Sequence, residues 1–459
     1  MSVPPRDSTA KAPRVGIVSL GCAKNLVDTE VMLGHLDRAG CELTADPDDA
    51  DVLLVNTCGF IEAAREESIR TILEAAEHKK SGRVRRLIVA GCMVQRYPDE
   101  LQNSLPEVDA FIGLDQLDRV VGEVRPEFRE SKLLSIAPSR GPSRYLYDDR
   151  TARRLATPPW TAYVKIAEGC DHTCSFCAIP AFRGAFRSRD LDSVADEARS
   201  LARGGVREIN LIAQDSSHYG RDRGEADGLP KLLEALDAIE ELRWIRLHYL
   251  YPNTVTERLI AAMARLPKVV KYVDLPLQHA HPETLARMRR GGSAASHLRL
   301  LERFDGAMPE VAKRTTFIVG FPGETEQEFQ ALLEFVSAAR FDHVGVFTYS
   351  HEEDTPSGEL HDDVPAEVKD ERRARLLELQ QGIAFERNRE MIGRTVEVLM
   401  EGAHAETPHL LVGRMSTQAL DVDGQVMVND GVADPGTFVS VELTEAAGYD
   451  LVGRIALDG

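Results

Sequence analysis

The chain contains 459 residues, of which 43% are hydrophobic and 28% charged, a composition typical of soluble globular proteins and long enough for about three domains. The formal net charge of −19 argues against a general nucleic-acid-binding protein, which would carry a basic face, and is compatible with a basic protein partner. No apolar run approaches the ~18–20 residues that span a bilayer, and residues 1–13, expected to be a disordered tail, lack the apolar core of a signal peptide. We therefore expect a cytoplasmic protein with no membrane partner, whose cysteines stay reduced.

Residues 14–130 have the pattern of a parallel α/β sheet domain. Apolar strands are expected at 14–20, 51–56 and 86–90, and segments with apolar residues close to the helical period follow the first two. Short apolar strands that alternate with helices are typical of parallel sheets.

Each of these three strands is followed within one or two residues by a cysteine, namely Cys22, Cys58 and Cys92. The carboxyl ends of parallel strands lie at one edge of a sheet, where such folds place ligands, so the three thiols are expected to converge. The repeated position favours a three-cysteine cluster site. The alternative is three buried thiols, because free cysteine is among the most buried residue types. Cys41 lies outside the pattern and is expected to be a structural thiol.

Residues 131–155, rich in Pro, Arg, Asp and Ser, are expected to form a linker, and residues 156–388 a series of β/α units. Six units are too few for a complete eight-fold barrel of typically ~250 residues, so a partial, open barrel is predicted, with its chemistry at the carboxyl ends of the strands. The candidate strands are 163–167, 208–213, 244–250, 272–275, 315–319 and 343–348.

Residues 389–459 turn to an all-β pattern, in which short apolar strands are separated by Gly, Asp and Asn. This pattern suggests a small five-stranded barrel. Such barrels often bind oligonucleotides, but residues 391–459 contain three basic and eleven acidic residues, a net charge of −8. An RNA-binding barrel should be neutral to basic, so this one better suits a basic protein surface or a solvated lid.

The most informative stretch is the loop after the first barrel strand, with Cys170, Cys174 and Cys177 separated by three and then two residues. Four thiolates are usual for an iron–sulfur cube, so three leave one iron open to bind and activate a small molecule. A zinc site would need a fourth ligand, for which His172 is a candidate at poor spacing. A disulfide would leave an odd thiol and need an oxidising compartment.

The spacing of these three cysteines, directly after the first strand of a partial β/α barrel, resembles the radical S-adenosylmethionine signature. The resemblance implies a 4Fe–4S cluster on Cys170, Cys174 and Cys177, which are then the catalytic cysteines, with S-adenosylmethionine on the fourth iron. It also implies reductive cleavage of S-adenosylmethionine to a deoxyadenosyl radical. Activating an unreactive C–H bond is beyond a histidine or carboxylate tuned near neutrality, so a cofactor has to carry that step.

The resemblance extends along nearly the whole chain. Residues 19–28 (SLGCAKNLVD), 56–60 (NTCGF) and Gly91-Cys92 look like the N-terminal domain of the methylthiotransferases, and the acidic barrel corresponds to their TRAM domain. That family implies a second 4Fe–4S cluster on Cys22, Cys58 and Cys92. It also implies conversion of C–H to C–S–CH3, with one S-adenosylmethionine as radical source and another as methyl donor.

Two branches of this family differ in substrate: one modifies an adenosine in tRNA, the other an aspartate of ribosomal protein S-twelve. Residues 21–28, 211–215 (LIAQD) and 349–356 (YSHEEDTP) resemble the ribosomal-protein branch, although Asp354 stands where that branch usually has Gly. The acidic barrel favours the same branch, because ribosomal proteins are basic and complementary charge steers association. We expect the aspartate-modifying enzyme, with the tRNA enzyme as the alternative. Its partners would be S-twelve, a sulfur donor and a low-potential electron donor such as flavodoxin.

Further residues are candidates for binding the cofactor. Gln214 and Asp215 follow the second barrel strand, a position that lines active sites in such barrels, although Asp215 could equally cap a helix. Gly320 lies in a stretch that resembles the region where the adenine of S-adenosylmethionine packs, and its alternative is a strand-to-helix turn. Phe176 lies within the cysteine loop.

Other polar residues in the motifs have two interpretations. His279, which with Gln278 ends the fourth strand, is expected to be a structural hydrogen-bonding residue rather than a catalyst. Two arginine groups either hold a carboxylate or form a solvated basic face. They are Arg183, Arg187 and Arg189, and Arg287, Arg289 and Arg290.

Overall fold

The computed structural model describes residues 12–125, 140–407 and 409–456. They form two compact units. The first contains residues 12–156 together with 178–185, and the second residues 157–177 together with 186–456. The predicted tail at 1–13 lies almost entirely outside the described residues, as do residues 131–139 of the predicted linker. No helix in the described ranges is long and apolar enough to cross a membrane.

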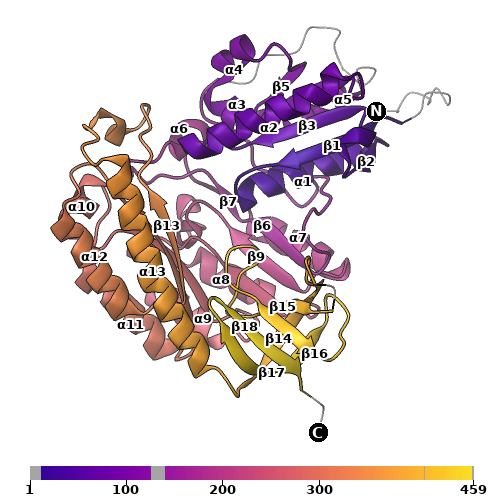
Figure 1. Cartoon of the computed structure of the whole chain (residues 1–459). Helices are drawn as coiled ribbons and strands as arrows, with labels where there is room; N and C mark the ends of the chain where they lie inside the picture. The colour runs from indigo at the N-terminus through magenta and orange to yellow at the C-terminus, as the bar shows by residue number, and fades with distance from the viewer. Residues whose placement is uncertain (1–11, 126–139, 408, 457–459) are drawn as a thin grey trace. The chain divides into compact units, whose positions relative to one another are not determined.

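The first unit is built on a parallel sheet with the order β2-β1-β3-β4-β5 within the described residues, which confirms the predicted α/β domain (Figure 1). Strand β3 is buried along its whole length and β4 is buried from residue 87 to residue 91, and Leu53 and Val55 pack against Ile72 of helix α2. The edge strands β2 and β5 are only three residues long, which is why the sequence pattern missed them. The strands are β1 Arg14–Ser19, β2 Glu42–Thr44, β3 Val52–Thr57, β4 Arg86–Gly91 and β5 Ala110–Ile112.

The helices of this unit include one from a distant part of the chain. They are α1 Ala23–Arg38, α2 Glu62–Lys80, α3 Cys92–Arg96, α4 Pro98–Ser104, α5 Val120–Val124 and α6 Ile179–Arg183. Part of the predicted linker also packs here, because Ser143 N donates to Phe182 O and Arg153 forms a buried ion pair with Glu30 at 2.6 Å.

The second unit contains the predicted partial barrel. Among its described residues, parallel strands are ordered β10-β9-β6 in one sheet and β11-β12-β13 in another. An isolated parallel bridge pairs Ile245 of β10 with Val269, three residues before β11. The six barrel strands are β6 Thr161–Lys165, β9 Glu208–Ile212, β10 Trp244–Leu247, β11 Tyr272–Gln278, β12 Ala312–Val319 and β13 His343–Thr348. Two short strands, β7 Ala167–Glu168 and β8 Arg187–Ser188, pair antiparallel beside them.

Helices cover the outer side of these strands, and α13 runs along β13 (Figure 1). Several begin at side-chain caps that the sequence encodes: Thr256 caps α9, and Thr325 with Glu328 forms a capping box for α12. The helices of this barrel are α7 Leu191–Arg203, α8 Gly228–Asp237, α9 Glu257–Arg265, α10 Pro282–Arg287, α11 Ala294–Ala307, α12 Glu326–Ala339 and α13 Ala366–Glu390.

The C-terminal residues form a closed barrel with the order β14-β15-β16-β18-β17 in the described range, as the all-β pattern predicted. Alternate residues such as Val398, Met400, Val441 and Leu443 fill its interior. The strands are β14 Thr395–Ala403, β15 Leu411–Met415, β16 Val426–Asp430, β17 Phe438–Ala447 and β18 Asp450–Ile455.

This small barrel packs against the amino-terminal ends of the β/α strands. Arg414 pairs with Glu208 at 2.7 Å, and the hydroxyl of Tyr272 donates to Asp423 at 2.7 Å. Glu208 and Tyr272 are the first residues of their strands, whereas the cysteine loop follows the other end of β6. The barrel is therefore a floor beneath the β/α strands and not a lid over the cysteine loop.

Candidate active site

The cysteine loop begins after β7 and is held by backbone and side-chain contacts to two later loops. Ser175 N donates to Met288 O at 3.0 Å, the Ser175 hydroxyl donates to Arg287 O at 2.8 Å, and Ser357 N donates to Ser175 O at 2.8 Å. All seven cysteines lie in the described ranges, and none of them is in a disulfide. The three thiols of the loop are thus available as ligands.

His172 is oriented by groups other than the thiols. Its Nε2 shares a hydrogen bond with Asp215 Oδ2 at 2.7 Å, and its ring stacks on Tyr251 with centroids 3.7 Å apart. The same carboxylate accepts from the Ser217 hydroxyl at 2.5 Å. The sequence predicted Asp215 as a cofactor-binding residue. The structure brings it to the cysteine loop, where it holds His172, and its contact with the cofactor stays a prediction.

Gln214 lies in a buried polar group at the carboxyl ends of β6 and β9. Its Nε2 donates to Glu168 at 2.8 Å, and Glu168 also pairs with Lys165 at 2.8 Å. Its Oε1 is buried and has no hydrogen-bond partner among the described residues. A buried acceptor without a donor is costly, so this oxygen could accept from a ligand that supplies an N–H or O–H. Cofactor binding by Gln214 stays a prediction.

The loop's aromatic residue, Phe176, packs in an apolar cluster with Met288, Phe321 and Tyr349. Nearby, Gly320 has φ +71°, and a Cβ there would lie 2.3 Å from Lys369 Cγ. The predicted strand-to-helix turn therefore requires glycine. Cofactor binding by Phe176 and Gly320 stays a prediction.

Two buried groups beside this turn have shifted pKa values. Burial raises the pKa of Glu324 to about 7 although Arg372 opposes it, and Glu324 accepts from Gly320 N at 2.7 Å. Burial lowers the pKa of His279 to about 3, so the imidazole is neutral. Its Nδ1 accepts from His281 N at 3.0 Å, which agrees with the structural role expected for it.

The arginines for which the sequence allowed two roles have different partners in the structure. Arg290 donates to Cys174 Sγ at 3.5 Å and to Pro276 O at 2.7 Å, and its guanidinium lies 4.4 Å from the centre of the Tyr251 ring. Arg287 pairs with Glu328 at 2.8 Å, and Arg189 pairs with Glu197 at 2.5 Å. Of these three, Arg290 reaches a cysteine, which no spacing in the sequence signals.

The donor set of the loop suits an iron–sulfur cluster better than a single ion. Within the described residues, no group of three His, Cys, Asp or Glu side chains is close enough to hold one metal ion. A cluster binds each thiolate through a different iron, so its ligands stand further apart. Burial raises the pKa of Cys170 to about 11, and binding iron would offset that cost because the ligand is the thiolate.

In the first unit, the cysteines that follow the three strands do converge. A Cβ on Gly21 would lie 2.9 Å from Cys58 Sγ, so the turn before Cys22 has to be glycine, with φ +87°. Burial raises the pKa of Cys92 to about 12, Arg183 opposes it, and the neighbouring Cys22 and Cys58 raise it further. The contact of Gly21 with Cys58 and the influence of Cys22 and Cys58 on the pKa of Cys92 agree with the predicted meeting of the three thiols, while their binding of a cluster stays a prediction.

The sequence allowed two roles for Arg183, binding of a carboxylate or part of a solvated basic face. In the structure Arg183 is buried beside the three N-terminal cysteines. Its Nη2 donates to Cys92 Sγ at 2.9 Å and to Asp28 Oδ2 at 3.0 Å. Neither a solvated face nor a substrate carboxylate is needed to explain it.

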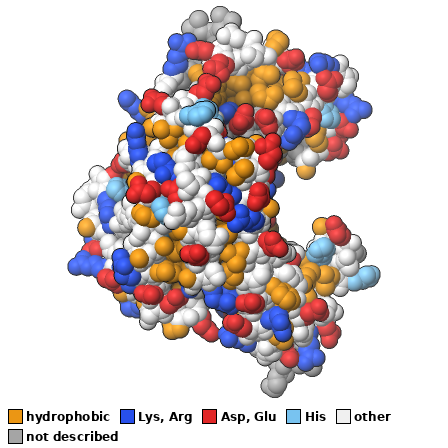
Figure 2. All heavy atoms as spheres, turned by 60° about the vertical axis from the view of Figure 1, so that its left-hand side comes forward, with side chains coloured by type: hydrophobic (Ala, Val, Ile, Leu, Met, Phe, Trp, Pro, Cys, Tyr) orange, Lys and Arg blue, Asp and Glu red, His pale blue; other side chains and the backbone are white. Residues whose placement is uncertain are grey.

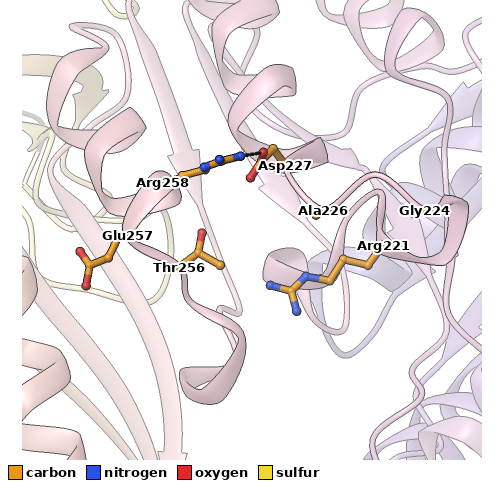
Figure 3. Close-up of a pocket in the computed structure, with 7 residues that line it drawn as sticks. All are labelled: Arg221, Gly224, Ala226, Asp227, Thr256, Glu257 and Arg258. Carbon is orange, nitrogen blue, oxygen red and sulfur yellow. Dashed lines mark hydrogen bonds and ion pairs between the residues drawn. The ribbon is translucent and has the colours of Figure 1, made fainter.

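A surface pocket of about 610 Å³ lies apart from these residues (Figure 3). It is open, and Arg258 points across it to pair with Asp227. No predicted site residue lines it. Its lining residues are Arg221, Gly224, Ala226, Asp227, Thr256, Glu257 and Arg258.

Comparison with known protein families agrees with this architecture. Residues 14–113 match the family described as "Uncharacterized protein family UPF0004", residues 164–336 the Radical SAM superfamily, and residues 392–456 the TRAM domain. A partial β/α barrel with a three-cysteine loop after its first strand and a radical SAM match defines a radical S-adenosylmethionine enzyme. That class implies a 4Fe–4S cluster and S-adenosylmethionine.

Full-length relatives narrow the class to one family. The chain is 50% identical over 448 residues to the ribosomal protein uS12 methylthiotransferase RimO of Solibacter usitatus, covering 96% of this chain and 94% of the relative. It is 48% identical over 442 residues to the protein of that name from Geobacter sulfurreducens, covering 96% and 98%. The chain belongs to the RimO methylthiotransferase family.

Solved structures agree on the fold. A radical S-adenosylmethionine methyltransferase, TsrM from Kitasatospora setae, superposes with a TM-score of 0.54 at 14% identity, over 88% of this chain and 81% of that chain. At this identity the likeness concerns the fold alone.

Proposed function

We propose that this protein methylthiolates the β-carbon of an aspartate in ribosomal protein uS12, the S-twelve protein of the small subunit, giving 3-methylthioaspartate. The observation that carries the proposal is identity of 50% over nearly the full length to an enzyme named for uS12. The cysteine loop and the second group of three thiols provide the parts that such chemistry needs.

The reaction replaces an aspartate C–H bond by C–S–CH3. Cys170, Cys174 and Cys177 would hold a 4Fe–4S cluster, which when bound would supply the electron for reductive cleavage of S-adenosylmethionine and hence for the abstraction of the hydrogen. The methyl group would come from a second S-adenosylmethionine. In this site Arg290 places a positive charge beside Cys174, and Gln214 Oε1 offers an acceptor for the methionine amine.

A second 4Fe–4S cluster, on Cys22, Cys58 and Cys92, would present the sulfur that is inserted. The convergence of the three thiols supports it. Anaerobic reconstitution followed by iron and sulfide quantification tests the count: replacing either group of three cysteines by alanine should remove about half of the iron. The matched control is Cys41→Ala, which should bind as much iron as the parent. Unchanged iron after replacing Cys22, Cys58 and Cys92 would exclude the second cluster.

Charge supports a basic protein substrate. The chain carries a net charge of −19. On the face that Figure 2 shows, acidic and basic side chains are intermixed and the basic ones do not gather in one patch. A tRNA substrate would favour a basic face. The remaining partners in the proposal are a sulfur donor and a low-potential electron donor such as flavodoxin, in the cytoplasm, where ribosomal proteins and reduced thiols occur together.

The experiment that tests the function is incubation of the reconstituted protein with purified uS12, S-adenosylmethionine, sulfide and a strong reductant. Mass spectrometry should find one aspartate that has gained one sulfur and one CH2. A Cys177→Ala variant is the control, and it should form neither deoxyadenosine nor modified peptide. Parallel incubation with unmodified tRNA decides the alternative, since thiomethylated tRNA with an unchanged peptide would move the assignment to the tRNA branch.

A further inference from the structure

Arg183 is a buried arginine that reaches a cysteine distant from it in the sequence. It ends α6, which begins two residues after Cys177 and belongs to the first unit. Its Nη2 donates to Asp28 Oδ2 at 3.0 Å and to Cys92 Sγ at 2.9 Å, and the side chains of Arg183 and Asp28 are each 2% exposed. Because burying a charge is costly unless it is paired, these two acceptors hold the guanidinium in place.

We propose that Arg183 is a positioning residue for the cluster on Cys22, Cys58 and Cys92: it donates to the Cys92 thiolate, and Asp28 fixes the guanidinium for that contact. The inference rests on the second cluster of the proposed function. It adds a residue that is not a ligand and that determines the charge next to one ligand.

The expected consequence is electrochemical. Hydrogen bonds to the ligand sulfurs and the net charge around a cluster set its reduction potential. A buried guanidinium stabilises the reduced, more negative state, so Arg183 should raise the potential of this cluster. Asp28 carries the opposite charge and should lower it.

A second buried ion pair of helix α1 provides the comparison. Arg153 pairs with Glu30 at 2.6 Å, with side chains 7% and 0% exposed, and Glu30 lies only two residues from Asp28. If Arg183 only anchored its segment, Arg183→Gln and Arg153→Gln would both reduce stability and leave the potential of the cluster unchanged. If it acts on Cys92, only Arg183→Gln shifts the potential.

The experiment uses the full chain with Cys170, Cys174 and Cys177 replaced by alanine, so that only the N-terminal cluster is present. Each variant is reconstituted anaerobically, its iron is counted, and its midpoint potential is measured by reductive titration followed by electron paramagnetic resonance. Arg183→Gln should give a more negative potential than this parent, Arg183→Lys an intermediate one, and Arg153→Gln the parent's value.

A loaded Arg183→Gln protein with the parent's potential would overturn the proposal. If that variant retains no iron, Arg183→Lys decides, since it keeps the positive charge and loses the guanidinium that Asp28 holds against Cys92. Its potential should be more negative than the parent's, and an unchanged value would overturn the proposal. If the parent with only Cys22, Cys58 and Cys92 binds no iron, the second cluster is wrong, and the inference about Arg183 is wrong with it. If the parent binds iron but the potential does not depend on Arg183, only the inference about Arg183 is wrong.

Discussion

Arg414 of the C-terminal barrel forms a buried ion pair with Glu208 at the floor of the β/α barrel. Nη2 and Oε2 are 2.7 Å apart, and the side chains are 2% and 0% exposed. Arg246 holds the other carboxylate oxygen at 3.0 Å and donates to Ser416 O at 2.8 Å. The small barrel is therefore fixed to the β/α barrel by a buried network in which the Glu208 carboxylate pairs with one arginine from each barrel.

Arg414→Ala should lower the free energy of unfolding by about 3 kcal/mol, because removing one partner of a buried pair leaves the other charge under-compensated. Urea denaturation measures the difference. The control is Arg454→Ala, which removes an exposed pair with Glu442 and should change stability by less than about 1 kcal/mol. Equal effects of the two substitutions would contradict the buried role of Arg414.

The same pair predicts a pH dependence. Burial alone would raise the pKa of Glu208, but Arg414 and Arg246 outweigh it and hold the pKa at about 2. An acid whose pKa is lower in the folded than in the unfolded state, where it is about 4.3, stabilises the fold above that higher value. This stability is lost as the pH falls from about 4–5 towards 2. Denaturation at stepped pH should show a flatter decline in Arg414→Ala than in the parent, and parallel curves would exclude the linkage.

Spacing and strand order are the signals that predict the two groups of cysteines. The loop cysteines lie within eight residues, and each N-terminal cysteine follows a strand of a parallel sheet, so topology alone brings them to one edge. The positions of Arg183 and Arg290 could not be predicted in this way. Their sulfur contacts are 91 and 116 residues away, and they depend on where a helix and a loop pack rather than on a local pattern.

The structure decides between two uses that were predicted for the acidic barrel. Its composition predicted a surface for a basic partner or a solvated lid, and its position at the amino-terminal ends of the β/α strands, where Arg414 pairs with Glu208, excludes a lid over the cysteine loop. Binding of a basic partner by this barrel stays a prediction. The net charge of a domain counts all of its charged residues and does not show which of them, such as Arg414, are buried at an interface.

Asp215→Ala should loosen the cysteine loop. It removes the carboxylate that accepts from both His172, at 2.7 Å, and the Ser217 hydroxyl, at 2.5 Å, and the loss of a hydrogen bond to a charged group costs about 1.5–3 kcal/mol. Iron should therefore leave the reconstituted protein faster when a chelator is added. Asp192→Ala, at an exposed position in α7, is the control and should release iron at the parent's rate. The prediction is wrong if the two variants release iron alike.

Gly320→Ala should destabilise the protein through the backbone as well as through packing. Gly320 has φ +71°, a region that costs other residues about 1–2 kcal/mol, and the new Cβ would lie 2.3 Å from Lys369 Cγ. Lys369 is itself buried and paired with Asp362 at 2.5 Å, so it cannot move aside without losing that contact. The matched control is Gly382→Ala, in the middle of α13 with nothing within 4 Å of the added methyl group, which should stabilise by up to about 1 kcal/mol. Urea midpoints of the two variants should therefore move in opposite directions from the parent, and a Gly320→Ala midpoint at or above the parent's would show that this turn tolerates a side chain.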